Sequence, residues 1–214
     1  MNAEPKTEDQ PAVPHFTRGG DDGRTTLGDF GVVAKDDFRL AAYGDCEEAN
    51  SVIGTAMALA GTANVDMVAT LASVQHDLFD LASDLMVPVG RRSADTAHIT
   101  QGHIDRLERA IEHFSADLPR AEGFVLPGGT AASSLIFQAR VVVRRAERTI
   151  WAAVEKYGDE VNPLAARYLN RLSALLFVLA RRRNAEHGDT VWLPMASVTP
   201  PQDQPMEAGS ATSA

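Results

Sequence analysis

Apolar side chains recur every three or four residues in five stretches of this chain, which is the spacing of amphipathic helices. Residues that favour helix ends bound these stretches: Asp36 or Asp37 precedes the first, Thr130 precedes the fourth, and Pro163 opens the fifth. The predicted helices span 36–60, 64–85, 95–117, 130–157 and 163–184. No segment shows a convincing strand pattern, so the sequence predicts an all-α five-helix bundle.

Both ends of the chain lack this periodicity. Residues 1–14 are polar with three prolines and are expected to be disordered, while residues 188–214 hold four prolines and are expected to form a flexible tail. Residues 15–187 should therefore form a single domain. Its glycine-rich segment at 15–35 is expected to be a loop that is disordered or becomes ordered on a ligand.

Charge and cysteine content narrow the functional classes. The chain carries 20 Lys and Arg against 29 Asp and Glu, a net charge of -9, which argues against a general binder of nucleic acid or anionic membranes. The single cysteine, Cys46, excludes an internal disulfide and fits a reducing compartment. Neither a secretion signal nor an apolar run long enough to cross a bilayer is visible, so a cytoplasmic location is expected.

A basic face on the fourth predicted helix stands out against this acidic background. At 100° per residue, Arg140, Arg144, Glu147 and Arg148 fall within about one third of the helix circumference. A bound polyanion would relieve the repulsion among these arginines, so we interpret the face as a phosphate-binding surface. The alternative is a set of ion pairs with Glu147 and with the acidic first helix.

The segment 15–35 offers a second candidate for phosphate binding. It holds five glycines, which allow backbone N–H groups to approach a ligand closely. It is not a P-loop, because GxxxxGK[ST] is absent, and the alternative is that the loop is simply mobile. If loop and basic face meet, N–H groups and guanidinium groups converge on a site suited to a triphosphate and its magnesium ion.

Other polar groups have plainer explanations. Glu47, Asn50, Ser51 and Gly54 share one face of the first helix, which we interpret as a solvated surface or a close helix contact. Asn170 either contacts a nucleotide or is a buried, satisfied amide.

An acidic line and three histidines complete the inventory of titratable groups. Asp77, Asp80 and Asp84 line one side of the second predicted helix, and we expect that side to be solvated. The histidines of the third predicted helix are five and ten residues apart, which does not match the i, i+4 spacing of zinc ligands on a helix, so we reject a zinc site.

Five segments together resemble the PduO-type ATP:cob(I)alamin adenosyltransferases, or corrinoid adenosyltransferases. The segments are residues 16–29, 35–54, 124–130, 139–148 and 170–181, and they occur in that family's order and at its spacing. The resemblance implies a five-helix bundle that assembles as a homotrimer with active sites between subunits. It also implies transfer of the 5′-deoxyadenosyl group of ATP to the cobalt of cob(I)alamin, giving adenosylcobalamin and triphosphate.

The implied reaction explains why no catalytic triad is evident. Cob(I)alamin is itself a strong nucleophile, so the protein has to place the two substrates and neutralise the leaving triphosphate. The resemblance implies Mg²⁺ as the companion of ATP. It also points to a flavoprotein reductase and an adenosylcobalamin-dependent mutase as partners.

The resemblance assigns roles to individual residues. The ATP loop would comprise Thr17, Arg18, Gly20, Asp21, Gly23 and Lys35. Arg144 and Arg148 would contact the phosphates, Glu147 would place them and help to hold magnesium, and Asn170 would touch the nucleotide. On the cobalamin side the implied residues are Phe124, Glu47 and Arg140. The catalytic residues would be Arg140, Arg144 and Phe124.

Two of these roles concern the corrin side in particular. Glu47 and Arg140 would form an ion pair across the subunit interface. Phe124 would press on the lower face of the corrin, displacing the axial ligand so that four-coordinate cob(II)alamin is easier to reduce.

The sequence departs from the family's pattern mainly on the corrin side. Glu47 replaces the usual Asp, Phe137 replaces a common His, and Ala174 replaces an Asp, while Gly19 stands where the ATP loop usually has Thr or Asn. The main alternative function is a non-catalytic cobalamin-binding delivery or sensor protein of the same fold, with ATP as a regulator.

Overall fold

The structure, a computed structural model, describes residues 16, 18–61 and 64–198. Within them, the five predicted helices are present as α1 (Phe38–Ala60), α2 (Val65–Met86), α3 (Gln101–Ser115), α4 (Ala131–Tyr157) and α5 (Pro163–Arg183). Three short 3₁₀ turns accompany them: η1 (Gly28–Phe30), η2 (Val89–Arg91) and η3 (Gly158–Glu160). The predicted all-α class is confirmed.

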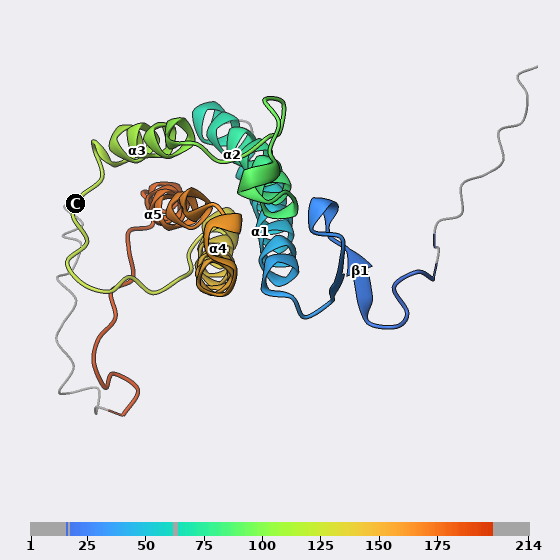
Figure 1. Ribbon diagram of the computed structural model, residues 1–214. Helices are drawn as coiled ribbons and strands as arrows, with labels where there is room; N and C mark the ends of the chain where they lie inside the picture. The colour runs from blue at the N-terminus through green and yellow to red at the C-terminus, as the bar shows by residue number, and fades with distance from the viewer. Residues whose placement is uncertain (1–15, 17, 62–63, 199–214) are drawn as a thin grey trace, which may run out of the picture.

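Helix α4 is the centre of the bundle (Figure 1). It packs against α1 on one side and α5 on the other, while α2 covers α1 and α3 covers α5. The small side chains of Ala139, Ala146 and Ala153, seven residues apart along one line of the helix, are fully buried and allow close packing there. Only a narrow stripe of α4 is left for solvent or ligands.

The segment 15–35 contains a short hairpin that the sequence did not predict. Strand β1 (Arg24–Thr26) pairs antiparallel with β2 (Val32–Ala34), with Thr25 opposite Val33. Three-residue strands are too short to show an alternating pattern, which is why periodicity missed them. Gly28 in the turn has φ +44°, and a Cβ there would overlap the Met86 carbonyl, so only glycine fits where the hairpin meets α2.

Arg39, in the first turn of α1, joins this hairpin to the bundle. Its guanidinium lies between the rings of Phe30 and Tyr157, 3.9 and 3.8 Å from their centroids. It also donates to both carboxylate oxygens of Asp37, with Nε–Oδ1 3.0 Å and Nη2–Oδ2 2.8 Å. The Tyr157 hydroxyl donates to the same carboxylate at 2.7 Å, so one cluster connects the hairpin to the end of α4.

Asp84 is buried, not solvated as expected, and it delays the start of α3. Its carboxylate accepts hydrogen bonds from the Ile99 N–H at 2.9 Å and the Asn162 amide at 2.7 Å, and it pairs with Arg92. These bonds hold the backbone just before α3 against α2 in a non-helical path. The helix therefore begins at Gln101 and not at the predicted residue 95.

The expectation of a solvated face is also wrong for Asp77. Its carboxylate accepts a hydrogen bond at 2.8 Å from the hydroxyl of Tyr168, a fully buried residue of α5, and pairs with Arg106 of α3. Both aspartates thus satisfy buried donors and connect α2 to the rest of the bundle.

The expected tail is paired at its start. Residues 190–192 lie antiparallel to 124–126, with Leu126 N–H donating to the Thr190 carbonyl at 2.8 Å and Trp192 N–H donating to the Phe124 carbonyl at 2.7 Å. The sequence did not predict this pairing; residues 199–214 lie outside the described part of the chain. No described helix combines the length and apolar character needed to cross a membrane.

Candidate functional site

The Pro127-Gly128-Gly129 turn fixes the start of α4. The side chain of Asn184, at the end of α5, accepts a hydrogen bond from Thr130 N–H at 2.9 Å and donates to the Gly128 carbonyl at 2.8 Å. Gly129 has φ +96°, and a Cβ there would overlap the Asn184 amide. Thr130 caps the helix as predicted, accepting from Ser133 N–H at 3.2 Å. The chain therefore enters α4 along one defined path.

The predicted basic face is present on α4. Arg144 and Arg148 are exposed, and Arg140 and Glu147 are half-buried. Within the described part of the chain, no carboxylate lies at ion-pair distance from any of the three arginines. Burial and the neighbouring Arg144 charge lower the pKa of Arg140. The ion-pair alternative therefore does not account for this face, which stays open to an anionic ligand.

Arg145, which follows Arg144 in the chain, does form ion pairs with the acidic first helix. Its guanidinium donates to Asp45 of α1 at 2.7 Å and pairs with Glu48 of the same helix. These bonds raise the pKa of Arg145, with Asp45 as the main cause. Arg145 thus secures α4 to α1, while the arginines of the basic face have no carboxylate partner among the described residues.

A hollow of about 360 Å³ lies beside this face, between α3, α4 and α5. Glu147 and Asn170 line it, with the Asn170 amide donating to the Glu147 carboxylate at 3.2 Å. Asn170 is exposed, so the alternative of a buried amide is wrong. Trp151 also lines the hollow, and the sequence analysis missed it. Its position four residues after Glu147 was a signal that could have found it.

A second hollow, of about 250 Å³, lies at the other end of the face. It is mainly apolar, with Phe124, Phe137 and Phe177 among its walls and Arg140 at its edge. The Arg140 guanidinium lies 5.4 Å from the Phe177 ring centroid. Phe124 is 77% exposed, although its ring edge contacts Trp192 at a centroid distance of 6.0 Å. So large an exposed ring beside an apolar hollow suits a large, partly apolar ligand.

The described residues of the candidate ATP loop lead into the base of the hairpin, where Gly20, Gly23 and Lys35 meet. The described loop residues are Arg18, Gly20, Asp21, Gly23 and Lys35; Thr17 lies outside the described residues. The Lys35 N–H donates to the Gly23 carbonyl at 2.9 Å, and its ammonium lies so close to Gly20 that a Cβ there would be 3.0 Å away.

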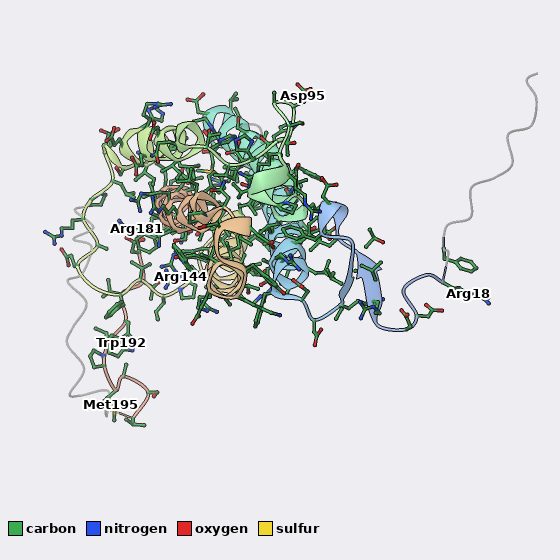
Figure 2. The ribbon with its side chains drawn as sticks, in the orientation of Figure 1. Arg18, Asp95, Arg144, Arg181, Trp192 and Met195 are labelled. Atoms are coloured by element: carbon green, nitrogen blue, oxygen red, sulfur yellow. The ribbon has the colours of Figure 1, made fainter. Side chains whose placement is uncertain are left out.

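One chain does not bring this loop to the basic face. Figure 2 shows Arg18 far out beyond the hairpin and Arg144 beside α4, on the opposite side of α1. Glu47 is exposed on α1 beside a hollow of about 420 Å³ between α1 and α2, and it makes no ion pair with Arg140 in the described part of the chain. The two halves of the expected site therefore lie on different sides of a single chain.

Two places offer ligands for a cation. Glu147 presents a half-buried carboxylate next to the basic face, and its contact with Asn170 occupies only Oε1. Asp77, Asp80 and His103 have ligand atoms within 4.8 Å of one another, but Asp77 already pairs with Arg106, whose charge opposes a metal ion. Glu147 is the better candidate when phosphates complete the coordination.

Known proteins resemble this chain over most of its length. The model of the cobalamin adenosyltransferase family matches residues 15–183. The chain is 48% identical over 180 residues to a corrinoid adenosyltransferase of Mycobacterium bovis, covering 84% of this chain and 92% of that protein. It is 38% identical over 175 residues to the corrinoid adenosyltransferase of Bacillus subtilis, covering 81% and 88%.

Solved structures give the same result. A variant PduO-type ATP:corrinoid adenosyltransferase from Lactobacillus reuteri, complexed with cobalamin and ATP, matches with a TM-score of 0.76 and 30% identity, covering 84% of this chain and 96% of that one. The family match extends over the hairpin, the basic face and both hollows beside α4. The chain belongs to the cobalamin adenosyltransferase family.

Proposed function

We propose that this protein transfers the 5′-deoxyadenosyl group of ATP to the cobalt of cob(I)alamin, producing adenosylcobalamin and triphosphate. The observation that carries the proposal is the basic face of α4, whose arginines have no carboxylate partner in the described part of the chain and which lies between an apolar hollow and a polar one. A cobalamin and an ATP bound in these hollows would lie along one helix. Cob(I)alamin supplies the nucleophile, so the protein acts by orienting the substrates and by electrostatics.

On the nucleotide side, Arg144 and Arg148 neutralise the charge that develops on the leaving triphosphate. Their guanidinium groups are not paired with a carboxylate of the described chain, so they reach the phosphates without first breaking an ion pair. We propose that Glu147 helps to hold Mg²⁺, which when bound neutralises further phosphate charge. Asn170 contacts the nucleotide beside it.

On the corrin side, Phe124 presses on the lower face of the ring and displaces the axial ligand. The exposed ring at the mouth of an apolar hollow supports this role, because it is open to contact with a bound corrin. Removal of the axial ligand would make cob(II)alamin easier to reduce. The backbone pairing of 124–126 with 190–192 keeps the ring from turning away. Arg140, which lines the same hollow, is the proposed basic residue on the corrin side.

A homotrimer with active sites between subunits completes the proposal. In one chain, Arg18 lies away from Arg144 (Figure 2), and Glu47 makes no ion pair with Arg140 among the described residues. A neighbouring copy would bring its loop over the basic face and its Glu47 to Arg140, so each site would be shared. We also propose a cytoplasmic enzyme that receives an electron from a flavoprotein reductase and passes its product to an adenosylcobalamin-dependent mutase.

The activity is tested by incubating the protein with ATP, Mg²⁺ and chemically reduced cobalamin, and by following adenosylcobalamin formation. Turnover is expected; binding of both ligands without turnover would instead support the delivery or sensor alternative. Phe124→Ala should slow the reaction that starts from cob(II)alamin more than the one that starts from pre-reduced cob(I)alamin. Equal slowing of both would mean that Phe124 only packs.

Shared sites are tested by mixing two inactive variants. Lys35→Ala alters the loop and Arg144→Ala alters the basic face, so homotrimers of either variant have every site damaged. Mixed trimers assembled after co-unfolding and refolding would contain some sites built from the two intact halves, and activity should partly return. Complementation that never appears in confirmed mixed trimers would place both halves of the site in one subunit.

A further inference from the structure

Trp151 continues the basic face of α4 towards the end of the helix. It follows Arg144 by seven residues and Glu147 by four, so at 100° per residue it points in nearly the same direction as both. Its side chain is 41% exposed, although it lines the hollow between α3, α4 and α5. A tryptophan ring held at the edge of a hollow with one part still open is available to a ligand.

The hollow itself offers no excess of positive charge. Glu108 on one wall pairs with Arg171, the two groups being 2.6 Å apart, and Glu147 holds the Asn170 amide. Apart from the Glu108–Arg171 pair, the charged groups that line the hollow are Arg167 and Glu147, whose opposite charges balance. A triphosphate is therefore better stabilised by the unpaired arginines of the basic face than inside the hollow.

The uncharged end of a nucleotide suits the hollow better. Ile104 and Ala166 add apolar surface to the Trp151 ring. The exposed Asn170 amide is held by Glu147, to which it donates at 3.2 Å, and by Arg171, from which it accepts at 3.0 Å; it keeps one N–H and one lone pair for the edge of a base. The volume of about 360 Å³ lies within the usual range of small-molecule sites. Aromatic side chains bind bases by stacking, largely without regard to sequence or charge.

We infer that Trp151 contacts the adenine base of ATP and that Asn170 holds the edge of the base in this hollow. The inference rests on the proposed function, and it assigns the two ends of the nucleotide to two different parts of α4. The triphosphate lies on Arg144 and Arg148, and the base lies three to seven residues further along α4, against Trp151. Trp151 would thereby favour nucleotides over inorganic triphosphate.

Tryptophan fluorescence tests the contact directly, because the chain has two tryptophans. The variant Trp192→Phe keeps an aromatic ring beside Phe124 and leaves Trp151 as the sole tryptophan. Titration with ATP and Mg²⁺ should quench or shift its emission, and titration with inorganic triphosphate and Mg²⁺ should not. In Trp151→Phe, where Trp192 remains, ATP should leave the emission nearly unchanged.

Binding measurements separate a base contact from a structural role. By calorimetry, Trp151→Leu should weaken ATP binding by about tenfold or more, within the range for loss of a stacked base, and should leave triphosphate binding within about twofold. Trp151→Phe keeps a ring and should lose much less. Equal weakening of both ligands would overturn the inference, as would an ATP-insensitive Trp151 in protein that binds ATP calorimetrically. ATP binding that is absent from the wild type would instead overturn the proposed function, and this inference with it.

Discussion

Asn184→Ala tests whether the turn before α4 depends on a side chain of α5. Asn184 is 5% exposed and bonds both Thr130 N–H and the Gly128 carbonyl. In the variant, Thr130 loses the acceptor of its backbone N–H, at a cost of about 1–3 kcal/mol for an unsatisfied donor that is partly buried. The Gly128 carbonyl can still share the single proton of the Ser133 hydroxyl, 3.1 Å away, with the Ala180 carbonyl at 2.9 Å, so loss of the Asn184 bond costs about 0.5–1 kcal/mol. The unfolding free energy should fall by about 2–3 kcal/mol.

For a chain of this length that loss corresponds to a fall in Tm of about 4–12 °C, which calorimetry or circular dichroism resolves easily. A matched control is Asn64→Ala, another asparagine at a helix end. Its amide makes one long bond, 3.5 Å to the Ala60 carbonyl, and it does not cap the helix with its side chain. The control should lose less than about 0.5 kcal/mol. If both variants lose the same small amount, the contacts of Asn184 do not hold the turn and the reasoning fails.

Three other predictions concern charge and burial. The Arg39 guanidinium beside Asp37 holds the pKa of that carboxyl well below its usual range. The resulting stabilisation is present above the unfolded pKa of about 4 and is lost as the pH falls below it. The free energy of urea unfolding should therefore vary less between pH 5 and 2 for Asp37→Asn than for the wild type, whereas the exposed control Asp36→Asn should vary as the wild type does. Arg144→Ala should reduce kcat/KM by an amount equivalent to about 2–4 kcal/mol while Arg109→Ala, an exposed control on α3, should not, and near-normal turnover of the first would exclude its role. Burial raises the pKa of the Cys46 thiol, so a thiol reagent should modify it only as the protein unfolds, and rapid labelling of native protein would contradict the packing described.

The sequence predicted the helices well because their apolar periodicity is long and their ends carry recognisable residues. Pro163 and Thr130 begin α5 and α4 within one residue of the predicted positions. The start of α3 could not be read in the same way, since it depends on Asp84, which lies on another helix. A bond between distant segments leaves no periodic signal in either of them.

The candidate site was predictable to the extent that its residues share one helix. Helical spacing predicted from the sequence that Arg140 and Arg144 share one face of the helix, and the same spacing places Trp151 on that face. Spacing within a helix could not show which arginine is used for packing, because the partners of Arg145 are about 100 residues away in the chain. It also could not show that Phe124 is paired with the segment around Trp192.

The continuity of α4 limits how this protein can change over evolution. Arg140 at the apolar hollow and Glu147 at the polar one are seven residues apart, roughly 10 Å along a single helix with no break between them. Inserting or deleting one residue in this span would turn one contact set by about 100° relative to the other, and no loop lies between them to absorb the error. The separation of the two hollows is therefore set by the residue count of α4. Variation in length between related enzymes should collect before Phe124 and after Tyr157, and any motion during turnover should come from the segments around α4, with the helix itself unchanged.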